Sequence, residues 1–123
     1  MTNIKIEVED IILKGEIYDT PTGNQILSLL PIVNQFNVWG NELYFDIGIH
    51  LDQEPDAREE LEVGDLAYWP VGKAFCIFYG TTPTSTDGKP RAYSAVNVFG
   101  RIIDDVSGLK HINPESDIKI SKA

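Results

Sequence analysis

The chain has 123 residues, of which 42% are hydrophobic, and it carries a formal net charge of −9. This length and apolar content predict one domain, residues 1–123, built around a single core. The excess of acidic residues argues against nucleic acid and against anionic membranes as partners, because both of those surfaces attract Lys and Arg side chains.

The N-terminal part of the chain predicts a hairpin followed by a helix. Apolar and polar residues alternate over residues 4–8 and again over 11–17, which is the pattern of strands with one buried face. The short link between these segments predicts that they pair as a hairpin. Thr20 is a suitable helix N-cap, and Pro31 ends the apolar helical pattern that follows it. We expect this helix to cover one end of the fold.

The middle of the chain predicts two more strands and an acidic connection. Residues 32–39 and 42–47 have strand character, and the Gly40-Asn41 pair between them predicts a turn. Residues 48–64 are rich in Asp and Glu and contain little to bury. We therefore expect a solvated connection there, with at most one helical turn.

The C-terminal half contains the most apolar segments. Residues 66–69 and 74–79 are almost continuously apolar, which predicts strands that are buried on both faces. Residues 80–94 hold Pro, Gly and polar side chains and predict a surface loop. Two further strands are expected over 96–103 and 116–120, with a turn or short helical piece between them.

Together these segments predict a mostly β protein with about eight short strands and one or two small helices. The preferred architecture is a closed β-barrel. Closure explains how such an apolar antiparallel set avoids exposing unpaired strand edges to solvent.

Several motifs also point to a known family. The chain contains the motifs DTPTG (residues 19–23), WGNELY (39–44), GDLAYWPVG (64–72), IFYGTTP (77–83) and AVNVFGRI (95–102). In this set the chain resembles a family of small prokaryotic cyclophilin-like proteins of unknown function. The resemblance spans nearly the whole chain and implies a closed, eight-stranded cyclophilin-like barrel capped by helices. It implies no established activity.

The comparison with true cyclophilins shows departures at the positions that those isomerases use. Cyclophilins use an arginine against the prolyl carbonyl, and a pocket with phenylalanines, a tryptophan and a histidine. By resemblance, Asp46 stands at the arginine position, Arg91 at the tryptophan, Val96 at the histidine and Cys76 at a pocket phenylalanine. A carboxylate cannot stabilise an amide carbonyl as a cation does. We therefore do not expect ordinary prolyl isomerase activity.

Six aromatic or charged residues form the candidate ligand-binding set. Glu42 and Tyr44 are expected on the outer face of one strand. Trp69 and Tyr79 are expected at the ends of the two buried strands, and Arg91 and Tyr93 on the long loop. Aromatic side chains with one cation and one carboxylate suit a pocket for a short peptide or a small molecule. The alternative is that Trp69 and Tyr79 only complete the core and that Arg91 pairs with a surface carboxylate.

The remaining reactive side chains predict no catalytic, metal or cofactor site. His50 and His111 lie far apart in the sequence, and neither has a second ligand at the short spacing typical of zinc sites. Cys76, the only cysteine, lies in an apolar strand and is expected to behave as a small buried hydrophobe. One cysteine allows no internal disulfide, and the N-terminus has no signal-peptide pattern, so we expect a cytoplasmic protein.

The preferred interpretation is a non-catalytic module that binds a peptide segment or a small molecule. An alternative is an enzyme, either prolyl isomerase-like or associated with amide hydrolysis by analogy of fold alone. We expect a monomer or weak homo-oligomer. If a stable dimer buries Trp39 or Trp69, these aromatic side chains belong to an interface instead of a pocket.

Overall fold

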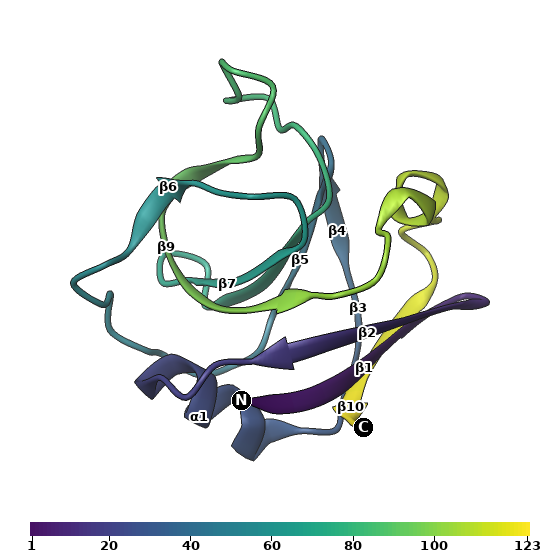
Figure 1. The fold of residues 1–123 in the computed structure, drawn as a ribbon, viewed down its shortest axis with the longest axis horizontal. Coiled ribbons are helices and arrows are strands. Elements are labelled where there is room, and N and C mark those ends of the chain that lie inside the picture. Colours follow the sequence, from purple (N-terminus) through teal and green to yellow (C-terminus); the bar gives the residue numbers. More distant parts are fainter.

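The computed structural model describes residues 1–123 as a mostly β fold with one α-helix and one short 3₁₀ helix (Figure 1). The ten strands are β1 (Thr2–Val8), β2 (Ile11–Ile17), β3 (Ile32–Gln35), β4 (Asn37–Trp39), β5 (Glu42–Asp46), β6 (Arg58–Glu60), β7 (Asp65–Trp69), β8 (Ala74–Phe78), β9 (Arg91–Ile102) and β10 (Asp117–Lys122). The helices are α1 (Pro21–Leu29) and η1 (Ser107–His111). Neither helix has the length and apolar character that a membrane crossing requires.

The predicted N-terminal hairpin and helix are confirmed. β1 pairs in antiparallel fashion with β2 on one side and with β10 on the other. Its alternating residues Ile4, Ile6 and Val8 are buried in the core. α1 begins at Thr20, whose hydroxyl oxygen accepts a hydrogen bond from the Gly23 backbone N–H at 2.9 Å, as an N-cap does.

The hydrogen-bonded sheet is open, so the expected closed eight-stranded barrel is not what the structure has. The ladder runs in the order β3-β10-β1-β2-β9-β7-β8-β5-β4, and β6 pairs only with β9. The two end strands are neighbours in sequence, with only Phe36 between them. β3 pairs with β10, whereas β4 pairs with β5. The strand expected over residues 32–39 is therefore broken at Phe36, where the chain changes partners and buries this ring in the core.

Apolar side chains form two clusters on opposite faces of the central strands. Successive residues of a strand point to opposite faces. Leu66 and Phe75 belong to the larger cluster, while Ala67 and Cys76, their neighbours in the chain, belong to the smaller one. This arrangement confirms the prediction that β7 and β8 are buried on both faces.

The smaller cluster exists because β6 and the first half of β9 fold over the outer face of β7 and β8. Arg58 of β6 lies opposite Val96 of β9, and Leu61, Ala92 and Val96 contribute side chains to this cluster. Two expectations are corrected here. Residues 48–64 contain a strand because β6 pairs through its backbone, and β9 begins at Arg91, so the surface loop is shorter than expected. This loop projects from the molecule in Figure 1.

Candidate functional site

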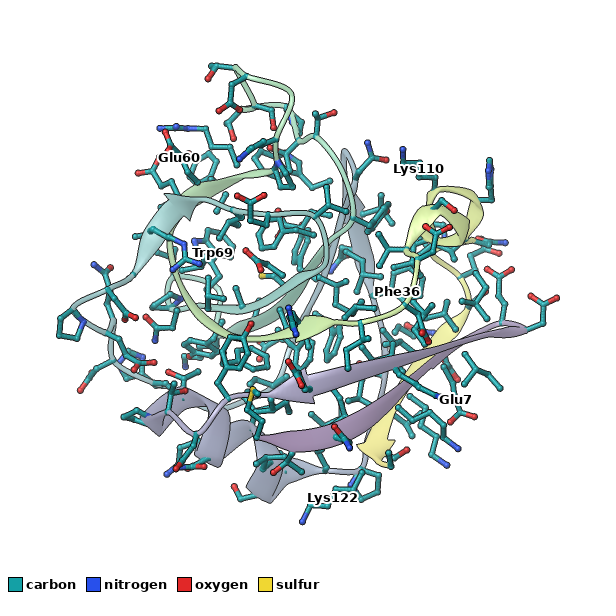
Figure 2. The ribbon with its side chains drawn as sticks, viewed as in Figure 1. Glu7, Phe36, Glu60, Trp69, Lys110 and Lys122 are labelled. Atoms are coloured by element: carbon teal, nitrogen blue, oxygen red, sulfur yellow. The ribbon has the colours of Figure 1, made fainter.

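A pocket of about 150 Å³ opens on the outer face of the sheet, next to the smaller apolar cluster. Residues from β4, β5, β7 and β9 line it, and Glu42 is the only charged one among them. The lining residues are Trp39, Glu42, Tyr44, Trp69, Ala92, Tyr93 and Val96. Figure 2 shows Trp69 near β6, β7 and β9, away from Phe36 in the larger core. The structure thus brings together four of the six candidate residues and leaves out Tyr79 and Arg91.

The turn between β4 and β5 places Trp39 beside Glu42. These two residues are direct partners in the antiparallel ladder, and such partners project from the same face of a sheet. Gly40 in the turn has a φ of 62°, and a Cβ atom there would lie 2.8 Å from Pro83 Cδ. Glycine therefore permits both the left-handed backbone and the close approach of the segment after β8.

The ring of Tyr93 stands nearly perpendicular to the rings of Trp39 and Trp69, and all three line the pocket. The ring centroids of Trp39 and Tyr93 lie 6.2 Å apart with an interplanar angle of 72°. Those of Trp69 and Tyr93 lie 6.1 Å apart with an angle of 76°. Tyr93 is 70% exposed and stands at the rim, whereas Ala92 and Val96 are buried at the base.

Two neighbours hold the Trp69 ring in place. Its indole Nε1–H donates a hydrogen bond to the Ser94 hydroxyl oxygen at 2.6 Å. Gly72 lies against the ring itself, because a Cβ atom there would be only 2.6 Å from Cε3 of Trp69. The ring is fixed by backbone on one side and by a polar anchor on another, so this wall of the pocket is preformed.

Glu42 is a buried carboxyl group with no cation beside it. It is 6% exposed and takes part in none of the six ion pairs of the structure. Burial raises the pKa of Glu42 to about 7, and the Cys76 thiol offsets that increase only in part. Removal from water favours the neutral form of a carboxyl group. Glu42 therefore exchanges between its neutral and charged forms near neutral pH.

Tyr79 and Cys76 approach Glu42 from within the protein and do not line the pocket. Tyr79 is 3% exposed and packs in the larger core, where burial and the Glu42 carboxylate raise the pKa of its hydroxyl. Burial, followed by the Glu42 carboxylate, also raises the pKa of the Cys76 thiol well above its usual value. A fully buried thiol with a raised pKa is a poor nucleophile, as the sequence led us to expect.

Arg91 lies in a separate acidic cleft beside β6. Its Nη2 is 2.9 Å from Oε1 of Glu59, and its Nη1 is 3.5 Å from Oε1 of Glu60. The other two arginines are also directed elsewhere, because Arg58 lines this cleft and Arg101 binds Glu16 at 2.8 Å. No arginine therefore lines the aromatic pocket. Arg91 therefore pairs with surface carboxylates, as in the alternative interpretation of the sequence.

Of the four positions compared with the cyclophilin site, only Val96 lines the pocket. Asp46 is exposed at the end of β5, where its carboxylate accepts a hydrogen bond from the Gly48 N–H at 2.6 Å. His50 lies on the surface, 3.3 Å from Asp52. No group of three or more His, Cys, Asp and Glu side chains is arranged to hold a metal ion.

Trp39 is the pocket residue that the sequence reasoning did not assign to the site. A signal for it exists, because a two-residue turn at Gly40-Asn41 places the residues on either side of the turn opposite each other. Ala92 was also missed, because the segment 80–94 reads as a loop and small apolar residues in loops carry no pattern.

Comparisons with known proteins agree with this architecture. No curated protein matches the chain. The solution structure of the hypothetical protein AF2241 from Archaeoglobus fulgidus is similar, with 36% sequence identity and a TM-score of 0.80. The similarity covers 99% of this chain and 95% of the archaeal one. A family model described as cyclophilin-like matches residues 2–121. The chain therefore belongs to the cyclophilin-like family.

Proposed function

We propose that this protein is a ligand-binding module that captures a small molecule or a short peptide segment in the aromatic pocket. The observation that carries the proposal is the pocket itself, where the rings of Trp39 and Trp69, both nearly perpendicular to that of Tyr93, line the same space as one buried carboxyl group. Concave sites that are mostly apolar and hold a single polar group are typical of small-molecule sites. Preformed walls favour binding because little side-chain entropy is lost when a ligand enters.

The arrangement of charges supports binding over prolyl isomerisation. Isomerisation of this type needs a donor or cation against the prolyl amide. The pocket contains a carboxyl group and no arginine, lysine or histidine. In its ionised form, Glu42 would repel a negative charge that develops on the substrate.

One observation favours a second candidate function, an enzyme that uses Glu42 as a general acid or base. A buried carboxyl group in a pocket with a pKa of about 7 is suited to proton transfer at neutral pH. No second carboxyl group, histidine or lysine lines the pocket, and Cys76 lies behind its wall. The binding function therefore remains the preferred proposal.

A fragment and peptide library screened by NMR tests the proposal. Binding in the pocket shifts the indole N–H resonances of Trp39 and Trp69 together, because both rings line the same space. Shifts confined to the cleft around Arg91 would contradict it. An assay of proline isomerisation in a model peptide, on the protein and on Glu42→Gln, decides the enzymatic alternative. Rate enhancement that disappears in the variant would support the enzyme.

A further inference from the structure

We propose that the aromatic pocket binds an organic ammonium ion, whose charged nitrogen is enclosed by Trp39, Trp69 and Tyr93 and faces the Glu42 carboxylate. This inference rests on the proposed binding function and adds the chemical class of the ligand.

The arrangement of the aromatic rings favours a cation. Trp39 and Trp69 both stand nearly perpendicular to Tyr93, at centroid distances of 6.2 and 6.1 Å, and all three rings line the same pocket. Aromatic faces attract a cation within about 6 Å of the ring centroid, and tryptophan is the most effective of them. Cages of such rings are the usual receptors for alkylated ammonium groups.

The charge of Glu42 also favours a cationic ligand. The side chain is nine-tenths buried, lines the pocket and has no cationic partner in the protein. A ligand cation supplies the missing opposite charge in a desolvated site, whereas an anion would meet uncompensated repulsion. The net charge of −9 further raises the local concentration of cations near the protein.

The pocket offers few hydrogen-bond acceptors to a ligand. Apart from Glu42, the only oxygen atoms on the lining side chains are the hydroxyls of Tyr44 and Tyr93. A primary ammonium has three N–H donors and is strongly hydrated, so it loses much on entering such a site. A fully alkylated ammonium has no donors to satisfy. We therefore infer a preference for quaternary over primary ammonium groups.

The volume of the pocket agrees with a single alkylated head group. A cavity of about 150 Å³ in another protein accommodates one benzene molecule, and the pocket here has about the same volume. The exposed ring of Tyr93 leaves the mouth open to solvent, so the remainder of the ligand extends outward. The ammonium group can therefore belong to a free small molecule or to an alkylated lysine side chain of a peptide.

Binding of a cation must depend on pH, because Glu42 is neutral below its pKa. The titratable groups around it are Cys76 and Tyr79 on the protein side, and Tyr44 and Tyr93 in the pocket, and none of them is a cation. Affinity for an ammonium ion therefore rises as the pH increases through about 7. The fall towards lower pH levels off at about tenfold, the loss expected once the carboxyl group is fully neutral.

The experiment compares choline with the uncharged alcohol in which a carbon atom replaces its nitrogen. We expect choline to bind at least about tenfold more tightly, since the two molecules have the same shape and differ in charge. Glu42→Gln is expected to weaken the binding of choline about tenfold and to leave the affinity for the uncharged analogue unchanged. Glu60→Gln, which removes one exposed carboxylate from β6, is the matched control and leaves both affinities unchanged.

A second arm separates the two sources of the ligand. Capped trimethyllysine is compared with capped lysine and with choline, on the protein and on Trp39→Leu, with NMR spectra to show that the variant is folded. Tighter binding of trimethyllysine than choline assigns the pocket to a peptide, and the reverse assigns it to a small molecule. Loss of either affinity in Trp39→Leu supports the cage.

The outcomes distinguish this inference from the proposed function. If the uncharged alcohol binds in the pocket as tightly as choline, the ammonium inference is overturned and the binding function stands. If neither compound shifts the resonances of the pocket, the inference is also overturned, and the library screen decides the binding function separately. An affinity for choline that does not change between pH 5.5 and 8, about one pH unit and more on each side of the Glu42 pKa, equally contradicts it.

Discussion

Trp69 donates a hydrogen bond from its indole Nε1 to the hydroxyl oxygen of Ser94 at a distance of 2.6 Å. This bond joins the end of β7 to the first half of β9, and both elements contribute residues to the lining of the pocket. The position of one wall of the candidate site therefore depends in part on a polar contact between two strands.

Removing the hydroxyl group in Ser94→Ala should loosen this wall. The part-buried indole N–H loses its acceptor, at a cost of about 1 kcal/mol in the free energy of unfolding. We also expect the Trp69 indole resonance to broaden and ligand affinity to fall. Ser94→Thr keeps a hydroxyl group and is the matched control. An unchanged Trp69 resonance in Ser94→Ala would show that the bond does not position the ring.

Gly72 provides a second test of the same wall. A Cβ atom at this position would lie 2.6 Å from Cε3 of Trp69, closer than van der Waals contact allows. Gly72→Ala should therefore displace the ring, destabilise the protein by about 1 to 3 kcal/mol and reduce ligand binding. Urea denaturation measures the first effect. In Gly108→Ala the added Cβ meets Ile11 at 3.4 Å, an ordinary contact, so that variant is expected to be nearly neutral.

Glu42 should make stability depend on pH in a direction that can be predicted. Its folded pKa of about 7 exceeds the ordinary value of 4.5, so the folded state holds this proton more tightly than the unfolded chain. The stability that the folded state gains from holding this proton is fully present below pH 4.5 and is lost as the pH rises to about 7. Because one pKa unit corresponds to about 1.4 kcal/mol, the loss amounts to up to about 3 kcal/mol.

Glu42→Gln cannot ionise and should remove this loss. At pH 8 the variant is expected to be more stable than the natural chain by up to about 3 kcal/mol, and the difference should shrink towards pH 4.5. Urea denaturation at several pH values measures it. The surface variant Glu60→Gln should change stability by less than about 0.5 kcal/mol at every pH. A Glu42→Gln difference that does not vary with pH would contradict the burial of an ionisable carboxyl group.

Asn97 anchors the acidic segment 52–54 to the fold. Its buried side chain accepts a hydrogen bond from the Glu54 N–H at 2.8 Å and donates to the Asp52 carbonyl at 2.9 Å and to Thr22 Oγ1 at 3.1 Å. Asn97→Ala leaves these partners unpaired, and we expect a loss of about 2 to 3 kcal/mol. The exposed Asn24→Ala should cost much less. Equal destabilisation by both variants in thermal unfolding would refute the anchoring role.

Arg91 should have little influence on the aromatic pocket. Its ion pairs with Glu59 and Glu60 lie near the surface, where such pairs contribute about 0 to 1 kcal/mol. Arg91→Ala is therefore expected to reduce stability by less than about 1 kcal/mol and to leave ligand affinity in the pocket within about twofold. Calorimetric titration measures that affinity. A large loss would mean that the arginine acts on the ligand after all.

Much of the fold follows from local patterns in the sequence. The alternation of Ile4, Ile6 and Val8 predicts a half-buried strand, and the continuous apolar character of β7 and β8 predicts burial on two faces. β6 could not be predicted, because Arg58, Glu59 and Glu60 have no apolar alternation. This strand forms because its backbone pairs with β9.

The open ladder and the full pocket depend on contacts between distant parts of the chain. Nothing in the sequence around Phe36 marks a break, since neither Gly nor Pro lies there, and the strand ends only because its partner changes from β10 to β5. The sequence predicts a loop at Arg91 because the residues around it are polar, but this residue begins β9. Its separation from Glu42 is fixed by tertiary pairing alone.

The most direct test of the account is a crystal structure of the protein with its tightest binder from the fragment and peptide screen. The account predicts that the ligand lies between the rings of Trp39 and Trp69, with Tyr93 at its outer side and Glu42 within contact distance. A ligand seated in the acidic cleft beside Arg91, with the aromatic pocket empty, would contradict it.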